Sequence, residues 1–579
     1  MTRLAWRRTA RCVLLGLLVG CESPRAVPAP PKVDELREFV IDGPAPEESA
    51  GELMAEPSYS HRELLDQLAD VVKQPKIKGV FLRLSSLGGA WARVAELHTA
   101  LQRIRDAKKP VHCYFDDADN SAYALLASSC DRISIAPAGM LALTGLKAQV
   151  VYARELLETL GLQAELLQVG RFKGAADALT RSDMPSEVRE VLTQLIDDLQ
   201  ASLAARVMQG RSLDAASFAK AIDEGPHAPK AALERHLVDA IAFDDEARAK
   251  AKAAASAQRV VRISHGHGSG RIDLSDLWKA LWRSEPRKPE GKRIALSYLD
   301  GTIRDDEHDQ GAGASSGPFI EAMRRIADDH DIRALVLRID SPGGSALASD
   351  KMWHAVRRVA KRKPVIVSIG DMAASGGYYV ACAGTEIFAE DDSLVGSIGV
   401  VGGKIVGEKL ADRLGLRTVT LVRGQNADWS SPFKPFSDSE RAAVLRSMHD
   451  TYDTFLSRIR EGRKIEASQL AAVAEGRIMT GQRARAGGLV DSVGGLPQAL
   501  ARARSKAGLP DAAPLEVWHK ERSLFGLVSQ LASGVDSRVS ALPGGLLALP
   551  DFMRSPLLLS LLQREGGPLT ALPYALELN

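Results

Sequence analysis

Residues Lys363–Cys382 read K-P-V-I-V-S-I-G-D-M-A-A-S-G-G-Y-Y-V-A-C and place Ser375 between a strand-like and a helix-like segment. Val365–Ile369 is a short apolar, β-branched run bounded by a proline and a glycine, which is typical of a buried strand. The small residues and glycines that follow permit a sharp bend. Because residues 378–382 suit a buried helix, we expect Ser375 at a strand-to-helix corner, where backbone N–H groups can face an anion.

A second strand-like run lies upstream, where residues 334–344 read A-L-V-L-R-I-D-S-P-G-G and end in a glycine pair. Two neighbouring strand ends with glycine corners can bracket a carbonyl group. The N–H groups of Gly343 or Gly344 and of Gly376 are therefore candidate donors to an oxyanion, and removing one such donor from a protease has cost about 3–4 kcal/mol. Each glycine motif alone is more often only a turn, but the pair followed by G-S-I-G-V at 396–400 is far more specific.

A serine hydroxyl is a weak nucleophile until a base takes its proton. A Ser-His-Asp arrangement would need a histidine within reach, yet no histidine occurs between His354 and His449. Lysine is therefore a candidate base.

The length and composition exclude some classes of protein. A chain of 579 residues is too long for one ordinary domain, so we expect at least two. Its 75 basic and 73 acidic side chains leave a formal charge of +2, and only 5% of the residues are aromatic, so we expect no nucleic-acid partner. His265 and His267 have no cysteine or carboxylate partners at metal spacing. We therefore expect no metal site and no cofactor.

Residues 1–21 have the layout of an export signal. Several arginines precede the apolar run Cys12–Gly20, which is too short to span a bilayer comfortably. The run leads into L-V-G-C, which resembles the lipobox of bacterial lipoproteins and predicts Cys21 as an acylated first residue. An uncleaved anchor is the alternative, and in either case the protein would face the exported side of a membrane. Residues 22–32 are proline-rich and polar, which predicts a tether.

Three cysteines remain after Cys12 and Cys21, namely Cys113, Cys130 and Cys382. Because three cysteines cannot all pair with one another, they do not indicate a disulfide framework. Cys113 and Cys130 could pair in an oxidising compartment, but we favour the interpretation that they are small buried hydrophobic side chains.

The chain repeats itself. Leu82–Ala90 reads L-R-L-S-S-L-G-G-A, and 255 positions later Leu337–Ser345 reads L-R-I-D-S-P-G-G-S. The same offset relates Tyr123 to Tyr378. Each copy alternates apolar runs with helical segments, which predicts an α/β fold of two tandem repeats with parallel sheets and crossover helices.

We expect the repeats to span residues 33–263 and 292–521. The linker 264–291 carries apolar residues at helical spacing, for which we favour a helix docked on one domain over a membrane-dipping helix. The extension 522–579 is leucine-rich and broken by prolines, and its role as an oligomer contact or a membrane-facing piece stays open.

The two repeats differ where chemistry is expected. Under the 255 offset Asn120 stands opposite Ser375. Val169–Ala175 reads V-G-R-F-K-G-A, and alignment of Glu187 with Glu440, an offset of 253, places Lys173 opposite Asn426. This complementary loss suggests one composite site, with the serine from the second repeat and the lysine from the first. A lysine is a general base only when neutral, so burial must lower its pKa from about 10.4 toward neutrality. A solvated surface lysine is the alternative.

These residues resemble the long, tandem-repeat form of the signal peptide peptidase A (protease IV) family, a Ser-Lys branch of the Clp-protease/crotonase-like fold. The resemblance covers residues 33–520 and rests on four motifs: D-S-P-G-G at 340–344, A-A-S-G-G-Y at 373–378, G-S-I-G-V at 396–400 and G-R-F-K at 170–173.

The resemblance implies that Ser375 is the nucleophile, that Lys173 is the general base and that Ser397 helps to orient the lysine ammonium. It also implies peptide substrates, above all leftover signal peptides, and a bowl-like homo-oligomer, a tetramer, with inward-facing active sites. The expected location is the periplasmic face of the bacterial cell envelope, with a lipid on Cys21. Long members of the family usually carry a transmembrane anchor instead, so inner and outer membrane both stay open.

We therefore expect a membrane-associated serine endopeptidase. Crotonase-like acyl-CoA chemistry uses the same glycine corners, but export and the serine at the corner argue against it. A non-catalytic membrane scaffold would be expected to lose the serine or the lysine, and both remain.

Overall fold

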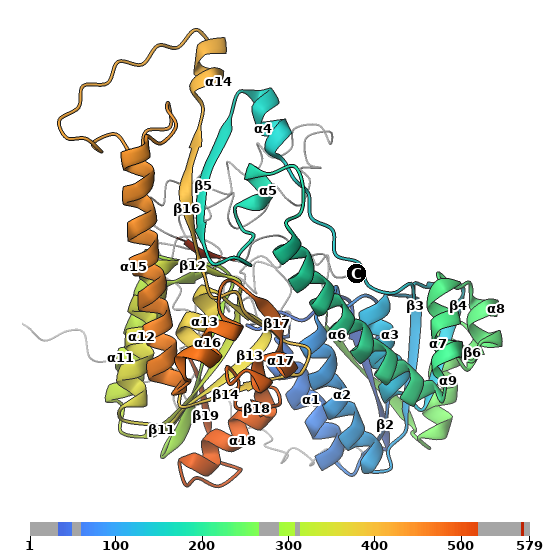
Figure 1. Ribbon diagram of the computed structural model, residues 1–579. Coiled ribbons are helices and arrows are strands. Elements are labelled where there is room, and N and C mark those ends of the chain that lie inside the picture. The colour runs from blue at the N-terminus through green and yellow to red at the C-terminus, as the bar shows by residue number, and fades with distance from the viewer. Residues whose placement is uncertain (1–32, 49–58, 266–288, 307–312, 519–568, 572–579) are drawn as a thin grey trace, which may run out of the picture.

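The computed structural model (Figure 1) describes the chain except residues 1–32, 49–58, 266–288, 307–312, 519–568 and 572–579. Cys21 and the predicted tether lie outside the described residues, as do nearly all of the linker 264–291 and most of the extension 522–579.

Six parallel strands form the sheet of the first repeat. The apolar runs of its central strands are almost continuously buried, as is usual in a parallel sheet with helices on its faces. The order across the sheet is β6 (Ala240–Ile241), β4 (Arg132–Leu141), β3 (Val111–Ala118), β2 (Ile77–Leu84), β1 (Glu35–Ile41) and β7 (Arg259–His265). The helices of this repeat are α1 (His61–Lys73), α2 (Trp91–Asp106), α3 (Asn120–Ser129), α4 (Arg154–Leu160), α5 (Asp177–Thr180), α6 (Ser186–Arg211), α7 (Ala215–Asp223), α8 (Pro229–Glu234) and α9 (Asp244–Ala254).

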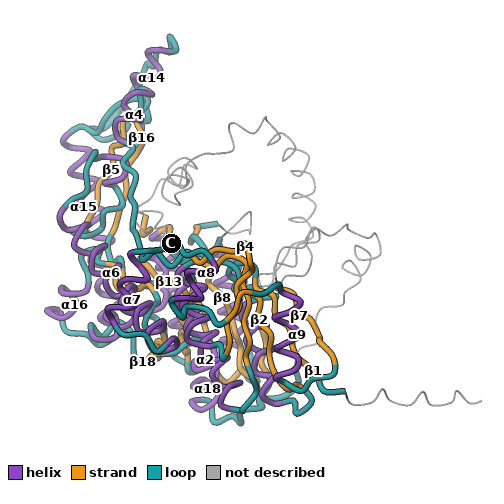
Figure 2. The backbone as a smooth tube through the Cα atoms, turned by 90° about the vertical axis from the view of Figure 1, so that its right-hand side faces the viewer, coloured by secondary structure: helices purple, strands orange, loops and turns teal. Residues whose placement is uncertain are grey.

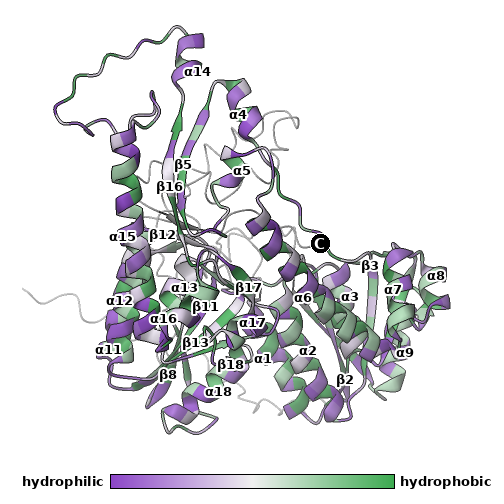
Figure 3. Ribbon diagram, viewed as in Figure 1, coloured by the Kyte–Doolittle hydropathy of each residue, from purple (hydrophilic) through white to green (hydrophobic). Residues whose placement is uncertain are grey.

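The sheet of the second repeat is larger, and all its pairs are parallel except β15 with β17. Its main path is β17 (Ile478–Thr480), β15 (Leu394–Gly396), β13 (Val365–Ala374), β11 (Ile332–Ser341), β8 (Arg293–Asp300) and β19 (Leu515–Trp518), and β14 (Glu386–Ala389) and β18 (Ser492–Val493) lie beside it. The helices are α11 (Ser316–Asp328), α12 (Ala346–Ala360), α13 (Gly376–Ala381), α14 (Glu408–Arg413), α15 (Asp438–Arg463), α16 (Ala467–Val473), α17 (Gly481–Ala486) and α18 (Leu496–Lys506). Figure 3 shows hydrophobic residues concentrated on the central strands, between the helices.

A third sheet joins the repeats. Its order is β10 (Ala314–Ser315), β9 (Ile303–Arg304), β12 (Gly343–Ser345), β20 (Leu569–Ala571), β16 (Val400–Val406) and β5 (Gln163–Val169). Only β5 comes from the first repeat, and it pairs antiparallel with β16 along the full length of both strands. Figures 1 and 2 show β5 and β16 projecting from the body of the molecule together with α4 and α14.

The structure confirms the α/β fold with two tandem repeats. The long helices α6 and α15 have 26 residues each. The repeat-related tyrosines also make equivalent contacts, because the Tyr123 hydroxyl donates to Leu237 O at 2.7 Å and the Tyr378 hydroxyl donates to Leu489 O at 2.8 Å. The predicted strand Val365–Ile369 is confirmed and continues to Ala374, because β13 pairs with β15 beyond Gly370.

The interpretation of Cys113 and Cys130 as two separate buried thiols is wrong. The structure joins them in a disulfide, with their Cα atoms 6.0 Å apart. The packing of α3 against β3 brings the end of that helix to the strand, a proximity that their separation of 17 residues does not reveal. Cys382 is a buried free thiol.

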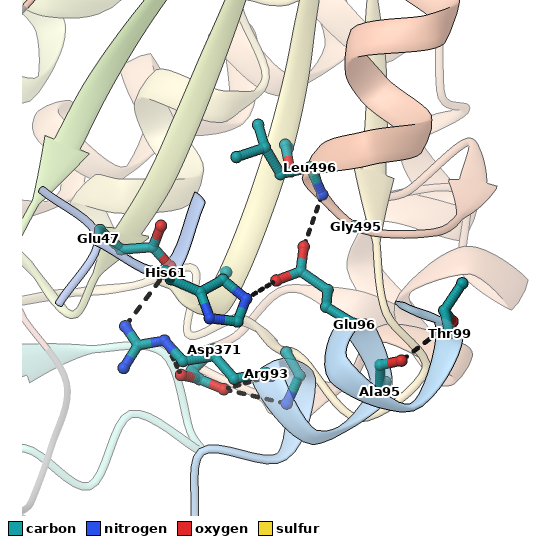
Figure 4. Close-up of polar contacts among 12 residues, drawn as sticks. Glu47, His61, Arg93, Ala95, Glu96, Thr99, Asp371, Gly495 and Leu496 are labelled. Carbon is teal, nitrogen blue, oxygen red and sulfur yellow. Dashed lines mark hydrogen bonds and ion pairs between the residues drawn. The ribbon is translucent and has the colours of Figure 1, made fainter. Parts of the chain in front are cut away.

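A buried network of charges holds the repeats together. Arg338 in β11 donates to the carboxylates of Glu47 and Glu96 at 2.9–3.0 Å. Figure 4 shows Glu96, on α2, also contacting His61 and accepting from the backbone N–H of Leu496, both at 2.6 Å. Burial alone would raise the pKa of Glu96, but the attraction of Arg338 and His61 outweighs burial and lowers it. Glu96 is therefore charged, and it links three distant parts of the chain.

Candidate active site

Ser375 lies at the junction between β13 and α13, as the sequence predicts. It is fully buried and has φ 53° and ψ −113°, in a region that residues with a side chain rarely adopt. Its N–H donates to Gly396 O at 2.7 Å, which fixes the corner against β15. Gly377, the second glycine after it, is needed for packing, since a Cβ there would lie 2.7 Å from Ser341 O.

Lys173 meets Ser375 across the boundary between the repeats. Its Nζ lies 2.8 Å from Ser375 Oγ, 2.8 Å from Ser397 O and 3.1 Å from Ser397 Oγ. The structure therefore brings together three residues singled out from the sequence, and it does so within one chain. Among the described residues, Lys173 is the only one whose side chain is hydrogen-bonded to Ser375 Oγ.

The lysine is fully buried, and no ion pair joins it to any described carboxylate. Burial disfavours the charged ammonium, so the pKa of Lys173 is well below that of a free lysine. Its sequence neighbours Phe172 and Ala175 are buried as well.

The strand pair β5 and β16 explains how residues 202 positions apart meet. Val169, at the end of β5, lies opposite Val400, at the start of β16. The chain reaches Lys173 just after Val169 and passes Ser397 just before Val400, so the pairing brings both side chains to Ser375. Gly399 leaves room for this approach, because a Cβ there would lie 2.9 Å from Lys173 Cδ.

The candidate oxyanion donors lie at two glycine corners. Gly376 begins α13, and its N–H donates to no described residue. Gly344 has φ 154°, and a Cβ on it would lie 2.0 Å from Ile303 O, so only glycine fits this strand. The Gly343 N–H is engaged, since it donates to Ser341 Oγ at 3.2 Å. Because this N–H already has an acceptor, Gly343 is a poor candidate for an oxyanion donor.

The sequence matches a family model. The model of peptidase family S49 matches residues 103–258 and 357–510, which together make up more than half of the chain. The chain belongs to peptidase family S49. The two matched segments fall in the two repeats, which agrees with the tandem-repeat form expected from the motifs.

Two relatives that this S49 peptidase matches over most of its length are named as proteases. The chloroplastic serine protease SPPA of Arabidopsis thaliana is 28% identical over 483 residues, which cover 82% of this chain and 70% of the relative. Protease 4 of Haemophilus influenzae is 28% identical over 444 residues, covering 74% of this chain and 70% of the relative. This protein is therefore a serine peptidase. The solved structure of a mutant of 1510-N, a membrane-bound stomatin-specific protease, matches 40% of this chain and all of its own with 12% identity and a TM-score of 0.26, which supports no further argument.

Sequence reasoning missed the loop that supports Lys173 from the second repeat. A Cβ on Gly476, which has φ 86°, would lie 2.3 Å from Lys173 N. The neighbouring Glu475 O accepts from Phe172 N at 2.8 Å, and Gly476 N donates to Ile398 O at 2.7 Å. The E-G pair resembles an ordinary turn, so only its position in the fold reveals this contact.

The D-S-P-G-G motif also contains an aspartate, Asp340, whose role is not evident from the sequence. Asp340 forms an ion pair with Arg93 of the first repeat at 2.8 Å, and Arg93 also contacts Asp371 at 3.2 Å. Figure 4 shows Arg93 and Asp371 facing each other across the boundary between the repeats. The motif thus anchors the first repeat beside the glycine corner.

The structure also bears on membrane-spanning helices and on metal sites. In the part of the chain that the structure describes, no helix is both long and apolar enough to cross a membrane. The described residues also contain no cluster of three or more His, Cys, Asp or Glu side chains that could hold a metal ion. The lipidation candidate Cys21 lies outside them.

Proposed function

We propose that this S49 peptidase is a membrane-associated endopeptidase that cleaves extended apolar peptides, with residual signal peptides as natural substrates. Ser375 is the nucleophile and Lys173 the general base. The observation that carries the proposal is the 2.8 Å hydrogen bond between Lys173 Nζ and Ser375 Oγ in a fully buried setting. The division into repeats 33–263 and 292–521 then assigns the base to one domain and the nucleophile to the other.

The contacts of the amine fit a general base. A neutral amine has two N–H groups and one lone pair. If its N–H groups donate to Ser397 O and Ser397 Oγ, its lone pair is left to accept the proton of the Ser375 hydroxyl. Ser397 would thus orient the lysine in both protonation states.

The reaction follows from these positions. Lys173 takes the hydroxyl proton while Ser375 Oγ bonds to the scissile carbonyl carbon, and the carbonyl oxygen becomes an oxyanion. The N–H groups of Gly376 and Gly344 stabilise that oxyanion. When the C–N bond breaks, Lys173 returns the proton to the leaving amine. Water then gives a proton to Lys173 and attacks the ester carbon. Lys173 passes that proton to Ser375 Oγ as the ester C–O bond breaks, which restores the free hydroxyl and the neutral amine.

Strand β20 supports the binding of an extended peptide. This segment of the chain's own extension runs antiparallel to Gly343–Ser345 and also meets β16 at Val401. Backbone groups next to a candidate oxyanion donor therefore accept an added strand, which is a recurrent way of binding peptides. We propose that substrates bind in this position in place of β20.

Several features support the envelope location and the homo-oligomer. The disulfide between Cys113 and Cys130 is of a kind that persists in oxidising, exported compartments. The lipobox-like sequence ending at Cys21 would supply a lipid anchor on the same side. Assembly as a tetramer is proposed from the family resemblance.

The test is hydrolysis of a leucine-rich fluorogenic peptide by the full chain in detergent. Ser375→Ala and Lys173→Met should each lower kcat by about 10⁴-fold or more, as for catalytic residues that act as a unit. Lys404→Met is a matched control, because Lys404 is also buried, has a pKa lowered mainly by burial and donates to Trp429 O at 2.8 Å. It should retain near-normal turnover. An active, folded Lys173→Met enzyme would disprove the assigned base.

A further inference from the structure

One arginine of the first repeat lies between two carboxylates of the second. Arg93 is in the first turn of α2, and its side chain is only 11% exposed. Its guanidinium contacts Asp340 at 2.8 Å and Asp371 at 3.2 Å, with Glu47 further away at 3.5 Å. Burial alone would lower the pKa of Arg93, but the attraction of these carboxylates outweighs burial and raises it. The guanidinium therefore stays charged and bridges β11 and β13.

The two aspartates stand just ahead of the candidate oxyanion donors. Asp340 is near the end of β11, and Gly344 follows it by four positions. Asp371 is near the end of β13, and Gly376 follows it by five positions. Each donor therefore comes shortly after a carboxylate that Arg93 contacts.

The backbone pairing of β11 and β13 is interrupted at this place. Beyond the pair Ile339 and Ile369, the next paired residues lie two positions along in β11 and four positions along in β13. Such a bulge disrupts the ladder of hydrogen bonds and bends the strand that contains it. The Asp340 side chain fills part of the gap, since it accepts from Met372 N at 3.1 Å. The relative position of the two strand ends thus depends on side-chain contacts.

Asp371 also contacts the start of α2. The helix has no side-chain cap from its own N-cap residue. Instead, Asp371 Oδ1 accepts from the N–H groups of Ala92 and Arg93 at 3.0 and 3.3 Å. A carboxylate at a helix N-terminus is stabilised by such N–H groups and by the helix dipole. Figure 4 shows Asp371 beside both this helix start and the Arg93 guanidinium, so α2 presents the arginine at a defined position relative to β13.

The corresponding corner of the first repeat lacks these charges. Under the offset of 255, Ser85 stands opposite Asp340 and Ala348 stands opposite Arg93. Neither Ser85 nor Ala348 can form an ion pair. The bridge therefore does not follow from the shared fold, and it belongs to the repeat that carries Ser375.

We propose that Arg93 is a positioning residue that sets the geometry of the oxyanion hole, the pair of N–H groups of Gly344 and Gly376. By holding Asp340 and Asp371 together, Arg93 fixes the ends of β11 and β13 and with them the two donors. The inference rests on the roles of these donors in the proposed function. The first repeat would then supply the active site with a general base and with a positioning cation.

Removal of the guanidinium would leave two carboxylates close together in a buried setting. Burial and the charge of Asp371 raise the pKa of Asp340, and the charge of Arg93 opposes this shift. Without Arg93 the two carboxylates would repel each other, or one of them would take up a proton. In either case the two strand ends lose their common partner, and a shift of about 1 Å at a catalytic group can lower a rate by about 10²-fold.

Kinetics of full-chain variants in detergent test the proposal. Arg93→Met should lower kcat for the leucine-rich peptide by about 10²-fold with little change in KM. The rise of kcat/KM with pH should keep its midpoint, because Lys173 is unchanged. Arg206→Met is the matched control, since Arg206 also joins the two repeats, through Asp392 at 2.9 Å, and its side chain is 17% exposed.

The control should keep kcat close to that of the wild type. The positioning role would be refuted by an unchanged kcat in folded Arg93→Met, by an equal loss in Arg206→Met, or by a shifted midpoint, which would place the effect on the lysine.

A leucine-rich peptide aldehyde reports on the oxyanion hole directly. The Ser375 hydroxyl adds across the aldehyde carbonyl, and the former carbonyl oxygen becomes the hemiacetal oxygen at the oxyanion position. The affinity for the aldehyde should fall in Arg93→Met by the same factor as kcat/KM, because both report binding of the tetrahedral state. It should stay unchanged in Arg206→Met. Equal aldehyde affinity in Arg93→Met and the wild type would overturn the proposal.

A double variant tests whether Arg93 acts through its carboxylate partner. Arg93→Met with Asp340→Asn leaves less unpaired buried charge than Arg93→Met alone, so it replaces the single variant in each measurement if that variant does not fold. Because both substitutions break the same bridge, the double variant should lose no more kcat than Arg93→Met. Losses that multiply would overturn the inference. A wild-type chain without Ser375-dependent hydrolysis would instead refute the proposed function itself.

Discussion

Lys173 and Arg338 are both fully buried basic side chains, yet their surroundings differ. Arg338 is held by the carboxylates of Glu47 and Glu96, and its pKa is raised because that attraction outweighs burial. Lys173 has hydroxyl and carbonyl oxygens around its amine and no carboxylate among the described residues. A buried ammonium without a counter-ion is costly, and the amine therefore loses its proton at a lower pH. The same fold thus keeps one buried cation charged and prepares the other to accept a proton.

The lowered pKa of Lys173 predicts the pH dependence of hydrolysis. The base must be neutral, so kcat/KM should rise tenfold per pH unit below the pKa of Lys173 and level off above it, well below pH 10.5. Ser397→Ala removes one acceptor of the protonated amine, so it should shift the rising limb to lower pH. Initial rates between pH 5 and pH 10 measure both effects.

The same shift has a consequence for stability. Between the folded pKa of Lys173 and 10.5 the unfolded chain binds more protons, so stability contributed by this site rises with pH. Lys173→Met should therefore stabilise the protein at neutral pH, and by less at pH 10. A kcat/KM that is flat with pH, together with a Lys173→Met stability difference that does not change with pH, would show a lysine that stays charged.

Among the elements, the loop 474–477 supports Lys173 most directly. Gly476→Ala adds a Cβ 2.3 Å from Lys173 N in a left-handed conformation, so the loop or the lysine must move. A displacement of about 1 Å at a catalytic group can lower the rate by about 10²-fold, and we expect a loss of that order in kcat. Gly508→Ala is the matched control, since it has φ 63° and an added Cβ would meet nothing within 4 Å. Comparable kcat values for the two folded variants would argue against a positioning role of the loop.

Elements that depend on neighbouring residues were predictable from the sequence, and elements that depend on distant contacts were not. The corner at Ser375 is visible because its strand, small residues and glycines are contiguous. Lys173 could be singled out only because alignment of the two repeats shows a lysine in the first repeat where the second has Asn426. Gly476 gave no signal, since its contact with Lys173 exists only after the two repeats pack. The Cys113–Cys130 bond was likewise hidden, because it depends on how α3 packs against β3.

At the scale of the molecule, buried charges rather than apolar contacts alone align the two repeats. Arg338→Met leaves Glu47 and Glu96 buried without their main partner, which typically costs about 3–5 kcal/mol for a broken buried pair. We expect a loss of that size in the free energy of unfolding, measured by urea denaturation. Arg324→Met removes the exposed ion pair with Glu321 and should leave the midpoint unchanged. An Arg338→Met protein as stable as the wild type would mean that the network does not hold the repeats together.

The division of the proposed active site between the repeats also bears on how such an enzyme is made. Lys173 is synthesised 202 residues before Ser375, and the amine has no nucleophile to activate until the second repeat has left the ribosome and folded against the first. A growing chain, or a fragment of either half, would therefore be inert toward the proteins around it. Proteolytic activity would begin only with the last docking step, so the fold itself would time the appearance of the protease.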